Sequence, residues 1–264
     1  MNKIKINEHF FNKIDTQESA YVLGLLYADG WVERGVTFGI ELLGHDKDIL
    51  DKIKLAMNAE QQIYPRIQKI NNKIKYVFRV HRKRMVQDLI NLGCIERKSL
   101  LLKFPNENII PPELMSHFIR GYFDGDGSVS EGVNVKVNFT GNTSFILDLR
   151  DYLASNSILN ANKPNYGKDK DRRLFCTMEW GGRGNAKKLF NYLYKDAVIY
   201  GQRKYDKFKK IICALEEKSS SETGLIAGKP EMVISSEASK EERSSTIPEM
   251  EVESSDSKCP ALNK

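Results

Sequence analysis

The stretch Tyr21-Val-Leu-Gly-Leu-Leu-Tyr-Ala-Asp-Gly30 decides the fold, because a second version of it, Phe118-Ile-Arg-Gly-Tyr-Phe-Asp-Gly-Asp-Gly127, follows later in the chain. Gly24 and Gly121 are 97 residues apart, and so are the two closing Asp-Gly pairs. The same offset relates Ile49-Leu50-Asp51 to Ile146-Leu147-Asp148. The chain is therefore predicted to contain two similar halves related by a pseudo-two-fold axis.

Each repeated stretch predicts a helix with small residues along one face. The small positions recur every four residues, which places them in one stripe: Ala20, Gly24 and Ala28 in the first copy, and His117, Gly121 and Gly125 in the second. A stripe of small residues lets two helices approach closely. The two helices are therefore expected to pack at Gly24 and Gly121, with Gly30 and Gly127 in the left-handed conformation that often follows a helix end.

This packing would bring Asp29 and Asp126 together. Both carboxylates would lie at helix C-termini, which each carry about half a negative charge. Either one carboxyl group keeps its proton or a cation lies between them. Carboxylate oxygens with open water positions suit Mg²⁺, and a metal held this way beside a phosphate suits hydrolytic cleavage of a phosphodiester. In a single copy, Asp-Gly would be an ordinary helix end, and the spacing after Asp124 does not fit an EF-hand, because Val135 stands where a bidentate Glu is required.

Outside the helices, alternating apolar and polar residues predict half-buried strands. In the second copy Val133, Val135, Val137 and Phe139 alternate with polar residues. The order expected in each copy is α-β-β-α-β-β-α, an α/β chain of the α+β type with antiparallel sheets. The expected domains are a lead-in over 1–16, a first repeat over 17–111, a second repeat over 112–216 and a disordered Ser/Glu-rich tail over 217–264.

The charge of the chain indicates a polyanionic partner. Residues 216–264 carry 11 acidic and 6 basic side chains, so residues 1–215 have a net charge of +11. A basic globular protein without such a partner is the alternative reading. The predicted strands also present polar faces that can reach phosphates and base edges in a major groove. The candidate DNA-binding residues are Arg66, Lys73, Lys75, Arg79, Lys136, Asn138 and Thr140.

The sequence shows no signal for a zinc site, a disulfide framework, secretion or a membrane span. The cysteines Cys94, Cys176, Cys213 and Cys259 form no C-x-x-C pair, which argues against a zinc site or a disulfide framework. The N-terminus lacks the apolar run of a signal peptide, and no stretch reaches membrane-spanning length. We expect a soluble intracellular protein without membrane contact, with the choice between an organelle (mitochondrion or chloroplast) and a prokaryotic or phage-infected cytoplasm left open.

The two motifs resemble those of the LAGLIDADG homing endonucleases, in the single-chain form with two motif copies. Tyr27 and Arg120 depart from the commonest letters, but both Gly-to-Asp spacings are intact. The resemblance in architecture covers about residues 15–215. It implies a monomer whose sheets form a saddle over double-stranded DNA, and site-specific hydrolysis of both strands at a long, asymmetric target with short 3′ overhangs.

The resemblance also implies roles for particular residues. Asp29 and Asp126, the last acids of the motifs, would hold the catalytic Mg²⁺, with Mn²⁺ or Ca²⁺ as other possible occupants. Lysines near each centre would polarise the phosphate or order the attacking water, and the candidates are Lys98 and Lys204, each preceded by an arginine. Glu41 and Thr140 are candidates for the polar side chain that the family places late in its first strand pair.

Two other functions remain open at this point. Some LAGLIDADG proteins are maturases, so the alternative is a splicing factor that binds intron RNA with weak or no nuclease activity. A DNA-binding regulator is the third reading, and the intact pair of acids argues against it.

Overall fold

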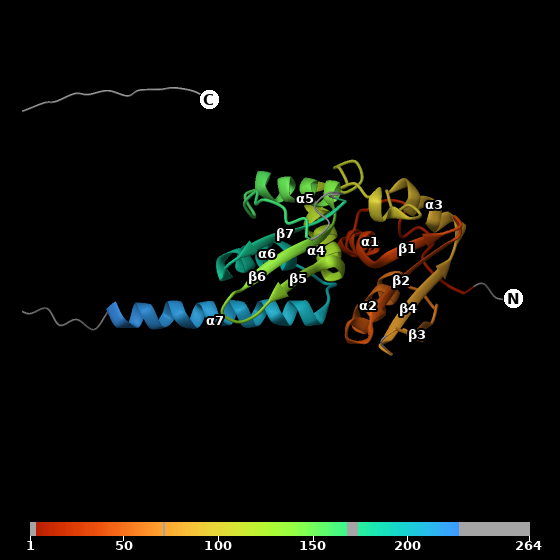
Figure 1. The fold of residues 1–264 in the computed structure, drawn as a ribbon. Helices are drawn as coiled ribbons and strands as arrows, with labels where there is room; N and C mark the ends of the chain where they lie inside the picture. The colour runs from red at the N-terminus through yellow and green to blue at the C-terminus, as the bar shows by residue number, and fades with distance from the viewer. Residues whose placement is uncertain (1–3, 71, 168–173, 227–264) are drawn as a thin grey trace, which may run out of the picture.

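The computed structural model describes residues 4–70, 72–167 and 174–226. It has two halves that meet at α1 (Gln17–Asp29) and α4 (Met115–Asp126), which lie side by side in the middle of the molecule (Figure 1). Each half places an antiparallel sheet against its central helix and covers it with further helices. The predicted duplication and the α+β architecture are therefore confirmed.

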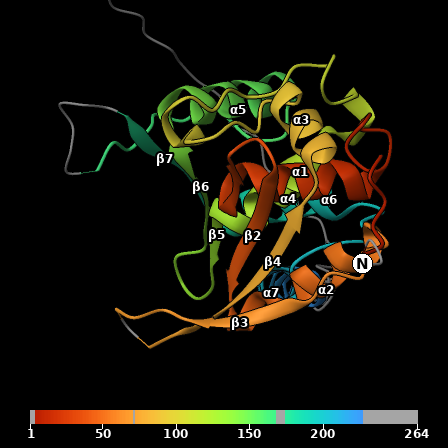
Figure 2. The same ribbon diagram turned by 90° about the vertical axis from the view of Figure 1, so that its right-hand side faces the viewer.

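The first half contains a four-stranded sheet in the order β1-β2-β4-β3. Its elements are β1 (Gly30–Glu33), β2 (Thr37–Leu43), α2 (Lys47–Ala56), β3 (Ile63–Ile67), β4 (Ile74–His81) and α3 (Lys83–Asn91). Phe38, Ile40 and Phe78 are buried on the inner face of the sheet. The β3–β4 hairpin projects beyond the body of the molecule (Figure 2).

The second half contains a three-stranded sheet in the order β5-β6-β7. Its elements are β5 (Gly127–Ser130), β6 (Lys136–Asn142), α5 (Thr143–Ser155), β7 (Phe175–Gly181), α6 (Arg183–Tyr194) and α7 (Gln202–Ile226). Val137, Phe139 and Trp180 are buried beneath the sheet. Short 3₁₀ turns lie at Gly44–Asp46, Lys98–Leu100 and Pro112–Leu114.

The fourth strand expected in the second copy is absent from the described residues. The expected order places this strand at about residues 158–166, where the structure has only a single bridge, between Asn165 and Thr177. Pro164 cannot donate to a strand ladder, and other groups replace the ladder: the indole of Trp180 donates to Asn160 O at 2.7 Å and the amide of Asn162 to Glu179 O at 2.7 Å. The second copy is therefore α-β-β-α-β-α.

Two further expectations were wrong at the edges of elements, and the lead-in over 1–16 is part of the first half. Val133 is 97% exposed and precedes β6, so it does not take part in the inward alternation. The lead-in packs on the first half through Phe10, Phe11 and Ile14, which are buried. Helix α7 continues to Ile226, past the expected start of the tail at residue 217, and residues 227–264 lie outside the described part of the chain.

Gly30 and Gly127 follow the two central helices, but neither is left-handed. Their φ values are −84° and −92°, which is extended backbone. A Cβ on Gly30 would lie 2.7 Å from the backbone oxygen of Leu26, and one on Gly127 would lie 2.2 Å from the ring of Phe123. Glycine is required because the chain folds back over its own helix, so each helix passes directly into the first strand of its half.

Candidate active site and nucleic-acid interface

The central helices are in contact through their backbones. A Cβ on Gly24 would lie 2.0 Å from the carbonyl oxygen of Phe118, and a Cβ on Gly121 would lie 2.0 Å from that of Tyr21. No side chain fits at either position, so the predicted crossing at Gly24 and Gly121 is confirmed. Thr16 caps the start of α1 by accepting from Ser19 N at 3.1 Å, and α4 begins after Pro112.

The crossing brings Asp29 and Asp126 to the same end of the helix pair. These two residues form the carboxylate pair. A Cβ on Gly125 would lie 3.0 Å from Oδ2 of Asp29, so the carboxylate of α1 rests against the last turn of α4. Asp29 and Asp126 both keep part of their surface exposed to solvent.

The surrounding protein opposes ionisation of both acids. Partial burial, followed by the charge of Asp29, raises the pKa of Asp126 to about 6. Burial also raises the pKa of Asp29, while the charges of Lys204, Lys98 and Lys75 act in the opposite direction. The pair therefore costs free energy when both members are ionised, and a bound cation would remove that cost.

Lys98 and Lys204 occupy equivalent places in the two halves. Lys98 Nζ donates to the carbonyls of Ala28 at 3.2 Å and Gly30 at 2.8 Å. Lys204 Nζ donates to the matching carbonyls of Gly125 at 3.2 Å and Gly127 at 2.7 Å. Each ammonium group thus neutralises the C-terminus of one central helix, beside its aspartate. The repeated Arg-Lys pair pointed to both lysines in the sequence, but not to their matching contacts with backbone carbonyls.

Burial lowers the pKa of both lysines. It lowers the pKa of Lys204 to about 8, and Asp124 is the largest opposing charge. Burial lowers the pKa of Lys98 as well, with Cys94, Asp126 and Asp29 acting in the opposite direction. Lys98 and Lys204 are only 9% and 5% exposed, so their contacts are fixed by the fold.

A pocket of about 320 Å³ opens beside Asp29 on the first-half side. Its lining includes Glu41, Asp46, Lys73, Lys75 and Arg203. Arg203, at the start of α7, donates from Nε and Nη2 to the two oxygens of Asp46, each at 2.8 Å, so the pocket wall joins the two halves. The sequence gave no signal for this ion pair, because the partners are 157 residues apart.

All of the candidate DNA-binding residues except Lys73 lie on strands. Arg66 and Lys75 are cross-strand partners on β3 and β4, and Arg79 lies further along β4. In the second half, Lys136, Asn138 and Thr140 alternate along β6 with the buried Val137 and Phe139. The hydroxyl groups of Thr140 and Thr177 are 2.9 Å apart. Lys73 precedes β4 and lines the pocket beside Asp29.

Carboxylates pair with most of these cations. Glu41 contacts Arg66 at 3.1 Å and Lys75 at 3.3 Å. Glu33 contacts Arg79 at 2.8 Å, and Glu179 contacts Lys136 at 2.8 Å. The outer faces are therefore networks of paired charges. Cross-strand register creates these pairs, which is why the sequence pattern alone did not reveal them.

The register also aligns the two halves residue by residue. Gly30 pairs with Ile40 in the first sheet, and Gly127 pairs with Phe139 in the second. The next residues, Glu41 and Thr140, are therefore equivalent, as the sequence comparison suggested. The two halves thus differ beside the carboxylate pair, with an ionisable side chain in one and a hydroxyl group in the other.

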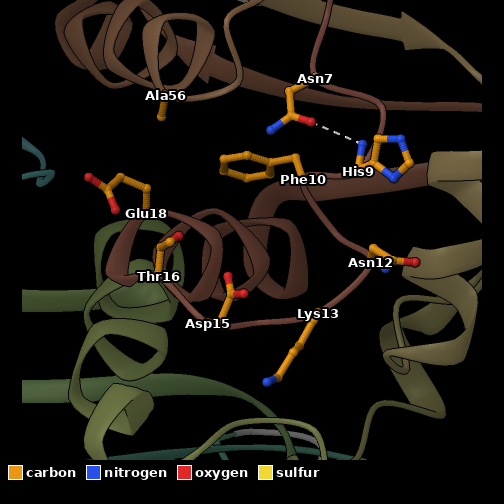
Figure 3. A pocket seen from close by; sticks show the side chains of 9 residues that line it. All are labelled: Asn7, His9, Phe10, Asn12, Lys13, Asp15, Thr16, Glu18 and Ala56. Carbon is orange, nitrogen blue, oxygen red and sulfur yellow. Dashed lines mark hydrogen bonds between the residues drawn. The ribbon is translucent and has the colours of Figure 1, made fainter.

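A second pocket, of about 510 Å³, lies away from the carboxylate pair. Asn7, Phe10, Lys13, Thr16 and Glu18 are among its lining residues (Figure 3). Thr16 caps α1 at its start, whereas Asp29 is the last residue of the helix. This pocket is therefore separated from the carboxylate pair by the length of α1.

Among residues 4–70, 72–167 and 174–226, no group of three or more His, Cys, Asp or Glu side chains is placed to hold a metal ion. In the same residues, no helix has both the length and the apolar character needed to cross a bilayer.

The chain is similar to known proteins both in sequence and in structure. Residues 113–213 match the model of the LAGLIDADG-like domain. The structure is similar to that of I-GzeII in complex with its DNA target, with a TM-score of 0.51, 15% identity, and coverage of 77% of this chain and 91% of that chain. It is also similar to I-WcaI bound to its DNA recognition sequence, with a TM-score of 0.53, 11% identity, and coverage of 73% and 87%.

A curated relative is the probable translation initiation factor IF-2 of Methanocaldococcus jannaschii. It is 32% identical over 117 residues, which make up 42% of this chain and 9% of that protein. Because the chain spans so small a share of that protein, the match does not carry the activity of an initiation factor. The resemblance seen in the two motifs is confirmed by the other comparisons: the chain carries a LAGLIDADG-like domain at residues 113–213 and has, across both halves, the fold of the LAGLIDADG homing endonucleases.

Proposed function

We propose that the protein is a monomeric, site-specific endonuclease that cuts both strands of a DNA duplex by metal-assisted hydrolysis. The observation that carries the proposal is the carboxylate pair, which the backbone contact of α1 and α4 holds at the junction of two strand-built faces. The fold is that of proteins solved with DNA targets, and this supports a duplex as the substrate.

The donor set fits Mg²⁺. This ion is usually bound by one or two carboxylates together with waters and substrate phosphates, so it needs no all-protein cage. Asp29 and Asp126 would hold it, and the raised pKa of each acid supports the need for a cation there. When bound, the metal would supply a water of lowered pKa and charge stabilisation at the scissile phosphate. Mn²⁺ and Ca²⁺ have the same preference for oxygen ligands and could occupy the site.

The side chains of the protein would supply the rest. Lys98 and Lys204 lie beside the carboxylate pair and would place a positive charge near each scissile phosphate. Arg66, Lys75, Arg79 and Lys136 would contact the duplex from the outer faces, after exchanging their carboxylate partners for phosphates or base edges. Asn138 and Thr140 would contact base edges on the second half-site, and Lys73 would contact the DNA backbone near Asp29.

The test is cleavage of a randomised duplex library with Mg²⁺, followed by sequencing of the ends. Asp29→Asn and Asp126→Asn are the matched variants, because each keeps the shape of the side chain and removes one charge. The expected result is a recurrent cut with a short 3′ overhang that disappears in both variants, while binding to the recovered site persists.

Near-normal cleavage by Asp29→Asn in Mg²⁺ would show that the carboxylate pair does not hold the catalytic metal. Binding of intron RNA without cleavage of any duplex would replace the endonuclease with the splicing factor as the function of this fold. A library recovered intact, with specific duplex binding retained, would favour the regulator.

A further inference from the structure

The two motif copies differ at the position two residues before the metal-binding aspartate. The first copy has Tyr27 there and the second has Asp124, which is 4% exposed. Tyr27 donates its hydroxyl hydrogen to Leu92 O at 2.5 Å, six residues before Lys98. Asp124 makes a different connection, which leads directly to Lys204.

Asp124 joins three segments through one carboxylate oxygen. Its Oδ2 accepts from the hydroxyl group of Tyr21 on α1 at 2.8 Å and from the backbone N–H of Gly201 at 2.7 Å. Gly201 immediately precedes α7, and its carbonyl accepts from Tyr205 N at 3.2 Å, so it belongs to the first turn that carries Lys204. The carboxylate therefore fixes the start of α7 against both central helices.

The fit around this link is tight. A Cβ on Gly201 would lie 3.2 Å from Cγ of Asp124 and 2.9 Å from Cδ1 of Ile49. Lys204 Nζ in turn donates to the carbonyl of Asp124 itself at 2.7 Å and to that of Phe123 at 2.6 Å. Lys204 is thus bonded to the same turn of α4 whose side chain anchors the start of its own helix.

We propose that Asp124 is a positioning residue for Lys204, and that it makes cleavage of one DNA strand depend on a buried link that the other centre lacks. The proposal rests on the endonuclease function proposed above. It assigns Asp124 no contact with DNA or metal: the side chain acts through Gly201 and the first turn of α7. A displacement of about 1 Å in a catalytic group can lower a rate by about 10²-fold, so loss of the link should affect one strand far more than the other.

The experiment measures the cleavage rate of each strand separately, on the target recovered from the library, with a different label on each strand. Lys98→Ala and Lys204→Ala identify which strand depends on which lysine. Asp124→Ala removes the link. Gly201→Ala breaks it from the other side without touching a charge, and so remains informative if Asp124→Ala folds poorly. Tyr27→Phe is the control at the matching position of the first copy.

The expected result is accumulation of nicked duplex. In Asp124→Ala and Gly201→Ala, the strand that depends on Lys204 should be cut about 10²-fold more slowly at saturating DNA, with the affinity for the target unchanged. Asp124→Asn should retain most of the rate, because both hydrogen bonds use Oδ2 and a single amide oxygen can accept both. Tyr27→Phe should leave the Lys204-dependent strand unaffected.

Equal slowing of both strands in Asp124→Ala and Gly201→Ala would show a general structural role and overturn the proposal, as would unchanged rates in both. Loss of the Lys204-dependent strand in Asp124→Asn would show that the charge acts rather than the link, and would also overturn it. If the wild-type protein cut neither strand of any duplex, the proposed function itself would fail and this inference with it, an outcome distinct from the others.

Discussion

Arg203 and Asp46 tie the two halves together beside the carboxylate pair, through two hydrogen bonds of 2.8 Å each between a guanidinium group and a carboxylate. Asp46 follows β2 in the first half, and Arg203 lies in the first turn of α7 in the second. The side chain of Asp46 is 13% exposed and that of Arg203 37%, so the pair is only partly screened by water. Lys204, which follows Arg203 in α7, is thereby held in a fixed position relative to the first half.

This pair is expected to contribute measurably to stability. A double-mutant cycle with Arg203→Met and Asp46→Asn should give a coupling free energy of about 1 kcal/mol. A bidentate ion pair contributes more to stability than an ordinary surface pair does. The pair Lys47–Asp51, one turn apart on α2, is the matched reference and should give about 0.3–0.5 kcal/mol. Urea unfolding at two salt concentrations measures both. Coupling equal to the reference would show that the bridge between the halves adds no more stability than an ordinary surface pair.

The contact at Gly24 predicts a large effect of a single methyl group. Gly24→Ala places a Cβ 2.0 Å from a backbone oxygen of α4, so the helices must separate. The expected loss of stability is about 1–3 kcal/mol, despite the better helix propensity of alanine. Gly184→Ala on α6 is the control, because no atom lies within 4 Å of the added Cβ. The free energy of unfolding of Gly184→Ala should equal that of wild type or exceed it by up to about 1 kcal/mol. A Gly24→Ala protein as stable as Gly184→Ala would contradict the close crossing.

Features that depend on local sequence patterns could be predicted, whereas contacts between residues far apart in the chain could not. Local patterns predicted α1, α4, the strands of the first sheet and the meeting of Asp29 with Asp126, because spacing along one helix determines which residues share a face. The strand over 158–166 failed because its alternation was weak and Pro164 interrupts it. The sequence correctly indicated that a glycine is needed after each central helix, but the predicted reason, a left-handed backbone, was wrong. The backbone there is extended, and glycine is needed because the chain approaches its own helix closely.

Long-range contacts of the site were not foreseeable in the same way. Glu33, Glu41 and Glu179 meet their cations through cross-strand register, which alternation within one strand does not specify. Asp124 was considered only as part of a calcium loop, and nothing local indicates that Gly201, 77 residues later, donates to it. Such pairs follow from the assembled fold, so a single sequence without its structure gives no access to them.

Metal binding should weaken as the pH falls through about 6. The pKa of Asp126 is raised to about 6, so protons compete with the metal below that pH. Calorimetric titration with Ca²⁺ and DNA between pH 5 and pH 8 measures the effect, with Asp126→Asn as the variant without this group. A Ca²⁺ affinity independent of pH over this range would exclude Asp126 as a ligand with a raised pKa.

The same shift has a defined sign for stability without metal. The pKa of Asp126 is higher in the folded state than the ordinary value of 3.8, so the folded state binds more protons between these values. The contribution of this group is present below pH 3.8 and is lost as the pH rises through about 6. Metal-free Asp126→Asn should therefore be more stable than wild type at pH 7.5, with the difference shrinking toward pH 4. A difference of opposite slope would contradict the direction of the shift.

Glu41 should restrain nonspecific DNA binding. It pairs with both Arg66 and Lys75, so Glu41→Gln frees two cations for phosphates. The slope of log K against log salt on random duplex should steepen by about 1–2, since each phosphate contact adds about 0.9. Glu60→Gln is the charge-matched control, because Glu60 accepts from Lys5 N in the N-terminal segment. An unchanged slope in Glu41→Gln would place the β3–β4 face outside the DNA interface.

Cleavage of the Lys204-dependent strand should decline above pH 8. Burial lowers the pKa of Lys204 to about 8, so the ammonium group that would face the phosphate loses its proton there. Because the folded pKa is below the ordinary value of 10.5, the unfolded state binds more protons between the two, and stability from this group rises with pH across that window. The decline in rate would therefore occur without loss of fold.

Cleavage rates measured separately for each strand from pH 6.5 to pH 9.5 test this expected decline. Lys204→Arg keeps its charge throughout this range, so its profile should lack the alkaline decline even where the altered head group lowers the absolute rate. An identical alkaline decline in wild type and Lys204→Arg would assign it to another group and remove the protonated amine of Lys204 from the reaction.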